Sequence, residues 1–282
     1  MAINKVGVLG AGTMGAGIAQ ICAEAGFQVL LVDIEQAFVD RGLKGVIKSW
    51  DKAVEKGKKT AEEVEKYKGS LSIAVGNANL KDCDFIIEAI FEDINIKKTV
   101  MQDLNSICAP DVILATNTSA LSITEIAAAS GRPDKVVGMH FFNPVPAMKL
   151  VEVIPGAETP QAVCDVVVDL CEKIGKVAIP MPESPGFIVN RILLPYINEA
   201  AILFQEGVAS AEQIDQAMKL GANMPMGPLA LADLIGLDVC LKICSYFWTE
   251  FGDSKYRPAL SIKQKVRAGH LGRKTGKGFY NY

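Results

Sequence analysis

Two residues with complementary proton chemistry lie twelve positions apart near the middle of the chain. His140 ends an apolar run that begins at Lys135, and Glu152 lies inside the next apolar run, with a turn-rich segment between them. A carboxylate that faces an imidazole orients the ring and stabilises the imidazolium, so the other ring nitrogen can act as base or acid. A structural histidine beside an unrelated surface glutamate explains the same spacing, and the residues alone leave both interpretations open.

A glycine-rich turn near the start of the chain has the pattern of a dinucleotide-binding fingerprint. The six residues GAGTMG begin at Gly10 and directly follow a short apolar run. Gly10 permits a tight turn, Gly12 lets a pyrophosphate approach the backbone, and Gly15 allows the following helix to pack closely on the strand. The N-terminus of that helix supplies N–H groups and a partial positive charge for phosphates. The predicted cofactor-binding residues of this turn are Gly10, Gly12, Thr13, Met14 and Gly15.

An acidic residue completes the fingerprint. Asp33 ends the next apolar run, eighteen residues after Gly15. A carboxylate at this place accepts hydrogen bonds from both ribose hydroxyls of an adenosine and repels a 2′-phosphate, which favours NAD over NADP. Arg41 and Lys44 follow shortly downstream, so NADP stays possible. The alternative is a glycine turn in another kind of α/β fold.

Two more polar side chains are candidates for contact with a ligand. Ser119 follows an apolar run at 111–116, at the carboxyl edge of the predicted sheet, where its hydroxyl can bond a substrate oxygen. Asparagine and serine after a strand are equally common as turn formers. Asn190 is an amide in a mostly apolar helical run, and either a local partner or a substrate explains it.

Composition narrows the class of protein. The chain has 282 residues, of which half are hydrophobic and 22% are charged, which is typical of a globular enzyme of about two domains. A net charge of −3 gives no sign of a nucleic-acid or anionic-membrane partner, and no apolar run reaches the length of a membrane span. Seven cysteines without a CxxC pair predict no disulfide framework and no metal site. The first strand begins near Met1, so we expect no signal peptide and a cytoplasmic location.

The order of elements predicts how these residues are positioned. Strand and helix patterns alternate as far as about residue 180, which is typical of a Rossmann-type, doubly wound α/β sheet. A lysine-rich helical insertion at 36–68 interrupts the alternation. The predicted NAD-binding domain covers residues 1–183.

The pattern of predicted elements changes in the second part of the chain. A proline-rich segment precedes residue 184, and nothing after it has a convincing strand pattern. Helices are predicted at 185–206, 211–220 and 237–251, with Ser184 capping the first and Ser210 opening a capping box in the second. The predicted second domain, at 184–282, is all-helical.

Longer blocks of sequence resemble L-3-hydroxyacyl-CoA dehydrogenases, with the closest likeness to the bacterial 3-hydroxybutyryl-CoA dehydrogenases. The blocks occur in the family's order along the whole chain, and HFFNP and PGFIVNR are much more specific than the glycine turn. They are GAGTMGAGIA at 10–19, NTS at 117–119, HFFNP at 140–144, KLVEV at 149–153, PGFIVNR at 185–191 and GRKTGKGFY at 272–280. Ala120 and Met224 depart from the serine and histidine expected there, which affects the fine shape of the pocket and not the chemistry.

The resemblance implies a reaction and its catalytic residues. The expected activity is the reversible oxidation of a short-chain (S)-3-hydroxyacyl-CoA to the 3-oxoacyl-CoA with NAD. His140 is implied as the general base, with Glu152 as its partner. Ser119 and Asn190 are implied to hold the 3-oxygen and the nearby acyl carbonyl of the substrate.

The resemblance also implies binding residues and an assembly. The implied cofactor contacts outside the glycine turn are Glu92, Lys97, Ser119, Asn143 and Lys274, and the implied coenzyme A contacts are Ser49, Lys56 and Ser119. On physical grounds the lysines at 48–59 suit the phosphates of coenzyme A, although a plain solvated helix has the same pattern. A homodimer through the helical domain is expected, with Met218, Leu220, Met224 and Met226 as a candidate surface. Those four residues can instead be intramolecular core.

Two alternative functions stay open. A dehydrogenase of free hydroxy acids or sugar acids would share the glycine turn and the histidine but would need no lysines for coenzyme A. A non-catalytic NAD-binding protein would need none of His140, Glu152, Ser119 and Asn190, so the presence of all four argues against it.

Overall fold

The computed structural model describes residues 2–282, and the chain divides into two compact units. The first unit extends to Ser184, and the second is Pro185–Tyr282. Within residues 2–282, no helix combines the length and the apolar character that crossing a membrane requires.

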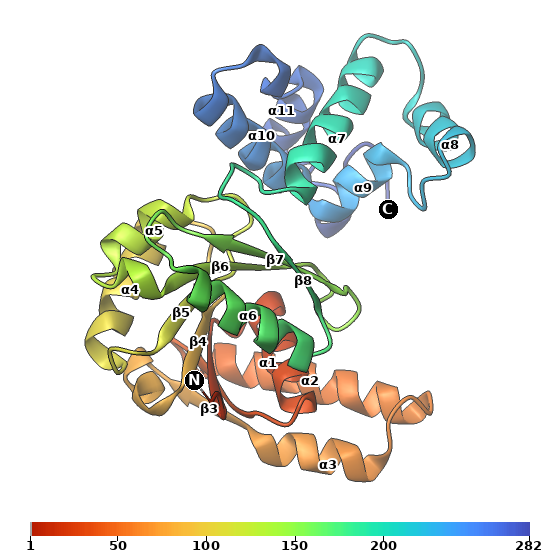
Figure 1. The fold of residues 1–282 in the computed structure, drawn as a ribbon. Helices are drawn as coiled ribbons and strands as arrows, with labels where there is room; N and C mark the ends of the chain where they lie inside the picture. The colour runs from red at the N-terminus through yellow and green to blue at the C-terminus, as the bar shows by residue number, and fades with distance from the viewer. Residues whose placement is uncertain (1) are drawn as a thin grey trace. The chain divides into compact units, whose positions relative to one another are not determined.

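The first unit is built on one sheet, in which eight strands are found among the described residues (Figure 1). The strand order is β3-β2-β1-β4-β5-β6-β7-β8, and all neighbours are parallel except β6 and β7, which are antiparallel. The order reverses direction between β1 and β4, as in a doubly wound dinucleotide-binding fold, so the predicted fold class is confirmed. The strands are β1 (Lys5–Leu9), β2 (Gln28–Asp33), β3 (Leu71–Val75), β4 (Phe85–Glu88), β5 (Ile113–Thr116), β6 (Val136–Phe141), β7 (Leu150–Pro155) and β8 (Val177–Pro180).

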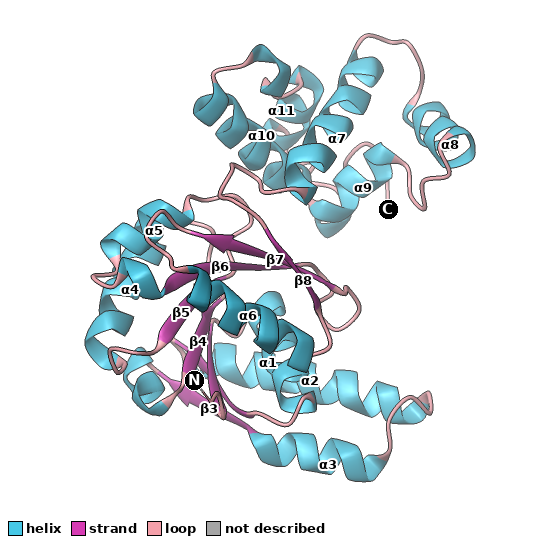
Figure 2. Ribbon diagram, viewed as in Figure 1, coloured by secondary structure: helices cyan, strands magenta, loops and turns pink. Residues whose placement is uncertain are grey.

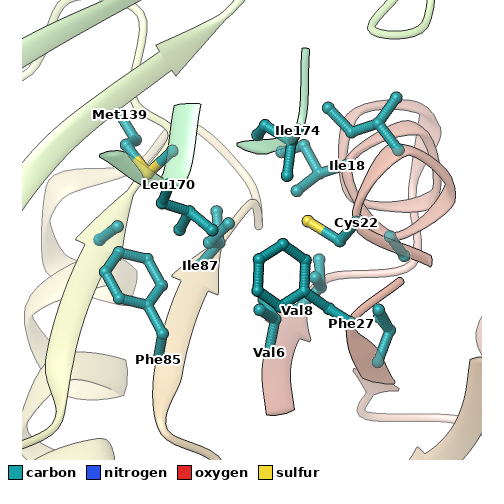
Figure 3. Close-up of a cluster of buried hydrophobic side chains, with 14 of the residues drawn as sticks. Val6, Val8, Ile18, Cys22, Phe27, Phe85, Ile87, Met139, Leu170 and Ile174 are labelled. Carbon is teal, nitrogen blue, oxygen red and sulfur yellow. The ribbon is translucent and has the colours of Figure 1, made fainter. Parts of the chain in front are cut away.

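Helices cover both faces of the sheet (Figure 2). They are α1 (Thr13–Glu24), α2 (Gln36–Glu55), α3 (Ala61–Ser70), α4 (Ile94–Ile107), α5 (Ile123–Ala129) and α6 (Gln161–Lys173), with short 3₁₀ turns η1 (Asn77–Asp82) and η2 (Pro133–Lys135). Figure 3 shows Val6 and Val8 of β1 packed with Ile18 and Cys22 of α1 on one face. On the other face, Leu9 and Ile86 pack with residues of α4 and α5. Burial of both faces explains why the central strands are continuous apolar runs.

The lysine-rich insertion, expected to be helical at 36–68, forms two helices. They are separated after α2, where Gly57 adopts a φ of +64°. Thr60 then starts α3 with a capping box, in which its hydroxyl accepts from the Glu63 N–H and the Glu63 carboxylate accepts from the Thr60 N–H. The local turn chemistry therefore overrides the continuous helical pattern.

The second unit is helical, as predicted. Its elements are α7 (Val189–Gln205), α8 (Ala211–Gly221), α9 (Pro228–Ile235), α10 (Leu237–Phe251) and α11 (Leu260–Arg267), with 3₁₀ turns η3 (Ser254–Tyr256) and η4 (Arg273–Thr275). The Ser210 capping box is present at the start of α8. The short helices α9 and α11 were not predicted.

The start of the first helix in this unit was predicted wrongly. The expected helix begins at Pro185 with Ser184 as its cap, whereas α7 begins at Val189. Gly186 and Phe187 between them have φ values of +76° and +53°, which are incompatible with a right-handed helix. A Cβ at Gly186 would lie 2.1 Å from the ring of Phe247, so this close approach requires glycine.

Candidate active site

The histidine and the glutamate singled out in the sequence form a buried pair. His140 on β6 is the direct partner of Glu152 in the antiparallel β6–β7 register, so both side chains emerge on the same face. His140 Nδ1 lies 2.7 Å from Glu152 Oε2. The exposed fractions of the two residues are 4% and 0%. Little solvent therefore reaches this contact.

The pairing assigns different tasks to the two ring nitrogens. With the carboxylate as acceptor, Nδ1 carries the proton of this hydrogen bond, so Nε2 is the nitrogen that can exchange a proton with a ligand. A buried carboxylate also stabilises the imidazolium once it forms. The pair can therefore act as a general base in one direction and as a general acid in the other.

An asparagine that the sequence did not single out holds the strand ends beside this pair. Asn117 Oδ1 accepts a hydrogen bond from the N–H of Phe141, the neighbour of His140, at 2.9 Å. The Asn117 N–H donates to the carbonyl of Glu88 at 2.7 Å. Asn117 thus joins the carboxyl ends of β4, β5 and β6. In the sequence it belongs to the NTS block, for which turn formation was one of two open interpretations, and its place directly after a strand was the only signal for the role it has here.

Ser119 and Glu92 are brought together at this edge of the sheet. Glu92 Oε1 accepts hydrogen bonds from the Ser119 N–H and the Thr118 hydroxyl, both at 2.7 Å. Ser119 is half-buried, in the loop that follows β5. Its hydroxyl therefore belongs to a loop that a carboxylate fixes through the backbone.

Lys97 has an unexpected environment for a residue implied to contact the cofactor. Its side chain is fully buried, and its Nζ lies 2.6 Å from Glu88 Oε1 and 3.8 Å from Glu92 Oε2. Lys97 therefore forms an ion pair with Glu92 from the protein interior. Its direct contact with the cofactor stays a prediction.

The glycine turn has the shape that a pyrophosphate requires. Gly10 has a φ of +104°, and a Cβ there would lie 2.5 Å from the carbonyl oxygen of Ala89. A Cβ at Gly15 would lie 1.7 Å from the carbonyl oxygen of Gly10, whereas nothing lies within 4 Å of one built at Gly12. Gly12 is also the N-cap of α1, so open space adjoins the first-turn amides of this helix. The residues present thus fit the phosphates of a dinucleotide.

Asp33 lies at the carboxyl end of β2, next to this turn. Its Oδ2 accepts from the Ala11 N–H and its Oδ1 from the Ile34 N–H, each at 2.7 Å. These bonds fix the orientation of the carboxylate. Each oxygen can accept more than one hydrogen bond, so the carboxylate can also receive ribose hydroxyls.

Comparison with known proteins decides the family. Residues 5–184 match the 3-hydroxyacyl-CoA dehydrogenase, NAD binding domain, and residues 186–282 match the C-terminal domain of the same enzymes. The chain belongs to the 3-hydroxyacyl-CoA dehydrogenase family. The resemblance inferred from the sequence blocks is therefore confirmed, and the first unit is the NAD-binding domain.

Full-length relatives agree with this assignment. The chain is 54% identical to a 3-hydroxybutyryl-CoA dehydrogenase of Clostridioides difficile, with 99% of each chain covered. It is 50% identical to a probable 3-hydroxybutyryl-CoA dehydrogenase of Bacillus subtilis, with 100% of this chain and 98% of that one covered. The crystal structure of an (S)-3-hydroxybutyryl-CoA dehydrogenase from Ralstonia eutropha matches with a TM-score of 0.97 and 47% identity, over 100% of this chain and 99% of that one.

Three further residues are implied for this dehydrogenase family, one in the first unit and two in the second. Asn143 is exposed in the loop after β6. Asn190 and Lys274 belong to the second unit, where Asn190 is the second residue of α7 and Lys274 Nζ lies 2.6 Å from Asp238 Oδ1. Their roles toward substrate and cofactor stay predictions.

The two residues implied for coenzyme A lie on or next to α2. Ser49 is half-buried near the middle of the helix, and Lys56 is exposed at its C-cap. Seven positions separate them, which is close to two helical turns and places both on similar faces. Lys59 is already paired with Glu24 at 2.9 Å, so it is less suited to bind a phosphate.

Proposed function

We propose that this chain interconverts (S)-3-hydroxybutyryl-CoA and acetoacetyl-CoA by hydride transfer with NAD(H). The observation that carries the proposal is the buried His140–Glu152 pair, at the same sheet edge as the glycine turn and Asp33. The choice of a four-carbon acyl group rests on the full-length relatives, which are 3-hydroxybutyryl-CoA dehydrogenases by name. A bound nicotinamide ring supplies the hydride acceptor for oxidation and the donor for reduction.

The protein's part in this reaction is to move a proton and hold the substrate. Neutral His140 takes the proton of the 3-hydroxyl at Nε2, and the Glu152 carboxylate stabilises the resulting imidazolium without removing its proton. In the reverse direction the imidazolium returns the proton to the 3-oxygen. Ser119 and Asn190 are proposed to hold that oxygen and the acyl carbonyl.

Loss of NADH absorbance with acetoacetyl-CoA tests the proposal. Parallel reactions contain NADPH in place of NADH, or free acetoacetate in place of the thioester. Oxidation of NADH with the thioester alone is the expected result. Activity with free acetoacetate would favour a dehydrogenase of free acids, and no activity with any pair would favour a non-catalytic NAD-binding protein.

Lys56→Ala tests whether α2 binds coenzyme A. We expect the KM for acetoacetyl-CoA to rise roughly three- to tenfold, the size of an exposed charge contact, while the KM for NADH stays unchanged. Lys66→Ala, which removes an exposed lysine from α3, is the matched control. An unchanged KM for the thioester in Lys56→Ala would remove Lys56 from the site.

We also propose a homodimer through the end of α8 and its connection to α9. Leu220, in the last turn of α8, and Met224, in the connection, are 76% and 41% exposed. Leu220 also lines a surface depression of about 500 Å³, together with Pro225 and Met226. Neighbouring exposed apolar side chains of this kind suit a second copy of the chain.

Leu220→Asp tests the dimer. We expect the wild type to sediment as a dimer and the variant as a monomer at the same concentration, because a charge in the contact would be buried without a partner. Val75→Asp, an equivalent change at the end of β3 in the other unit, should leave the dimer intact. A monomeric wild type or a dimeric Leu220→Asp would contradict the assignment.

The proposed location is the cytoplasm. All seven cysteines are buried free thiols within the described chain, and burial raises the pKa of Cys22 and of Cys171 to about 12. Such thiols pack as small apolar side chains, which suits a reducing compartment.

A further inference from the structure

A buried ion pair lies under the carboxyl ends of β4 and β5. Glu88 is fully buried, and its Oε1 accepts from Lys97 Nζ at 2.6 Å and from the Ile90 N–H at 2.7 Å. Its Oε2 accepts from the Thr116 hydroxyl at 2.6 Å. The two carboxylate oxygens are therefore held by donors from α4, from the loop after β4 and from β5.

A second carboxylate shares the same lysine. Glu92 Oε2 lies 3.8 Å from Lys97 Nζ, and its other oxygen accepts from the Ser119 N–H. The formal charges of Glu88, Lys97 and Glu92 add up to minus one. Because Glu88 and Lys97 have no solvent exposure, water screens their charges weakly, and they act over a longer range than surface charges do.

The topology indicates which part of a dinucleotide this cluster faces. In a doubly wound sheet the cofactor crosses the point where the strand order reverses, with one mononucleotide half on each side. Asp33, at the end of β2, marks the adenosine side of the β1–β4 switch point. The nicotinamide half then lies over the ends of β4 and β5, where Glu88 and Glu92 are found.

We propose that the charge of the Glu88–Lys97–Glu92 cluster, in which Glu88 is the buried carboxylate, sets the preference between oxidised and reduced cofactor. The nicotinamide ring is a cation in NAD⁺ and neutral in NADH. A net negative charge near the ring therefore lowers the dissociation constant for NAD⁺ relative to that for NADH. The inference rests on the proposed function, in that NAD(H) must bind at this edge.

Glu88→Gln removes the charge and keeps the shape of the side chain. Its amide oxygen can still accept from Lys97 and the Ile90 N–H, and its amide nitrogen donates to the Thr116 hydroxyl, which then becomes the acceptor. We expect the ratio of dissociation constants, Kd for NAD⁺ over Kd for NADH, to rise roughly three- to thirtyfold, measured by calorimetry with each form. Lys97 keeps Glu92 as a partner in this variant. Glu92→Gln makes the same charge change at a side chain that is 31% exposed, with less risk to folding, and should move the ratio in the same direction.

Two controls separate charge from geometry. Thr116→Val removes one hydrogen bond to Glu88 but no charge, so it should lower the melting temperature and leave the ratio unchanged. Glu24→Gln removes a lysine-paired carboxylate at the end of α1, and should also leave the ratio unchanged.

The outcomes are distinct for this inference and for the proposed function. If the wild type binds both cofactor forms and neither Glu88→Gln nor Glu92→Gln shifts the ratio, the inference is wrong and the proposed function stands. An equal shift in Thr116→Val would show that geometry and not charge is responsible, which also overturns the inference. If the wild type binds neither form, the proposed function itself fails.

Discussion

His140→Gln is expected to lower the turnover number by about 10²–10⁴-fold while the dissociation constant for NADH changes little. Glutamine can still hydrogen-bond to Glu152, so the β6–β7 pairing should persist. It cannot accept and return a proton near neutral pH, so the 3-hydroxyl loses its base. The result follows from the 2.7 Å contact of Nδ1, which assigns proton exchange to Nε2.

The second histidine provides the control. His270 is half-buried in the second unit, and the chain contains no histidine besides these two. His270→Gln should keep wild-type turnover with acetoacetyl-CoA and NADH. NADH binding is followed by the fluorescence of the bound nucleotide in both variants. Wild-type turnover in His140→Gln would contradict the assignment of His140 as the general base.

Arg132→Met is expected to lower the free energy of unfolding by about 3–5 kcal/mol. Arg132 is 8% exposed, and its guanidinium donates to the carbonyls of Asn105, Cys108 and Ala109 at 2.7, 3.0 and 2.6 Å. These carbonyls follow or end α4, where a helix has no backbone donors to satisfy them. Methionine fills a similar volume but leaves them buried without a donor, which is the reason for the large expected effect.

Urea unfolding of the first unit measures this loss. The chain has two tryptophans, Trp50 in the first unit and Trp248 in the second, so Trp50 fluorescence in a Trp248→Phe background reports on the first unit. Arg267→Met is the matched control, because Arg267 is exposed in the last turn of α11. A stability change below about 1 kcal/mol in Arg132→Met would show that water replaces the guanidinium at these carbonyls.

Local patterns were sufficient to predict most elements of this chain. Strands buried on both faces are continuous apolar runs, so β1, β4 and β5 were recognisable without knowledge of their neighbours. The capping box at Ser210 predicted the start of α8, because both partners are close in sequence. The left-handed Gly186 was missed because its conformation depends on packing against Phe247, sixty-one residues away.

In the candidate site too, contacts between residues close in sequence were easier to predict than contacts between distant ones. The spacing of His140 and Glu152 allowed them to face each other but left a structural histidine beside an unrelated glutamate equally open, and the cross-strand register decides for the facing pair. Glu88 and Asn117 were not predicted to support the site, because their partners come from other strands and from α4. A buried carboxylate within an apolar run, such as Glu88, is the signal that sequence reasoning can use.

The cross-strand placement of His140 and Glu152 has an evolutionary consequence. Both residues belong to residues 5–184, so the pair proposed to transfer the proton is contained in one inheritable module. The module at 186–282 can be duplicated, exchanged or reshaped in a lineage without rebuilding that pair. We therefore expect changes in the module at 186–282 to leave the type of reaction in place, since the acid–base pair belongs to the other module.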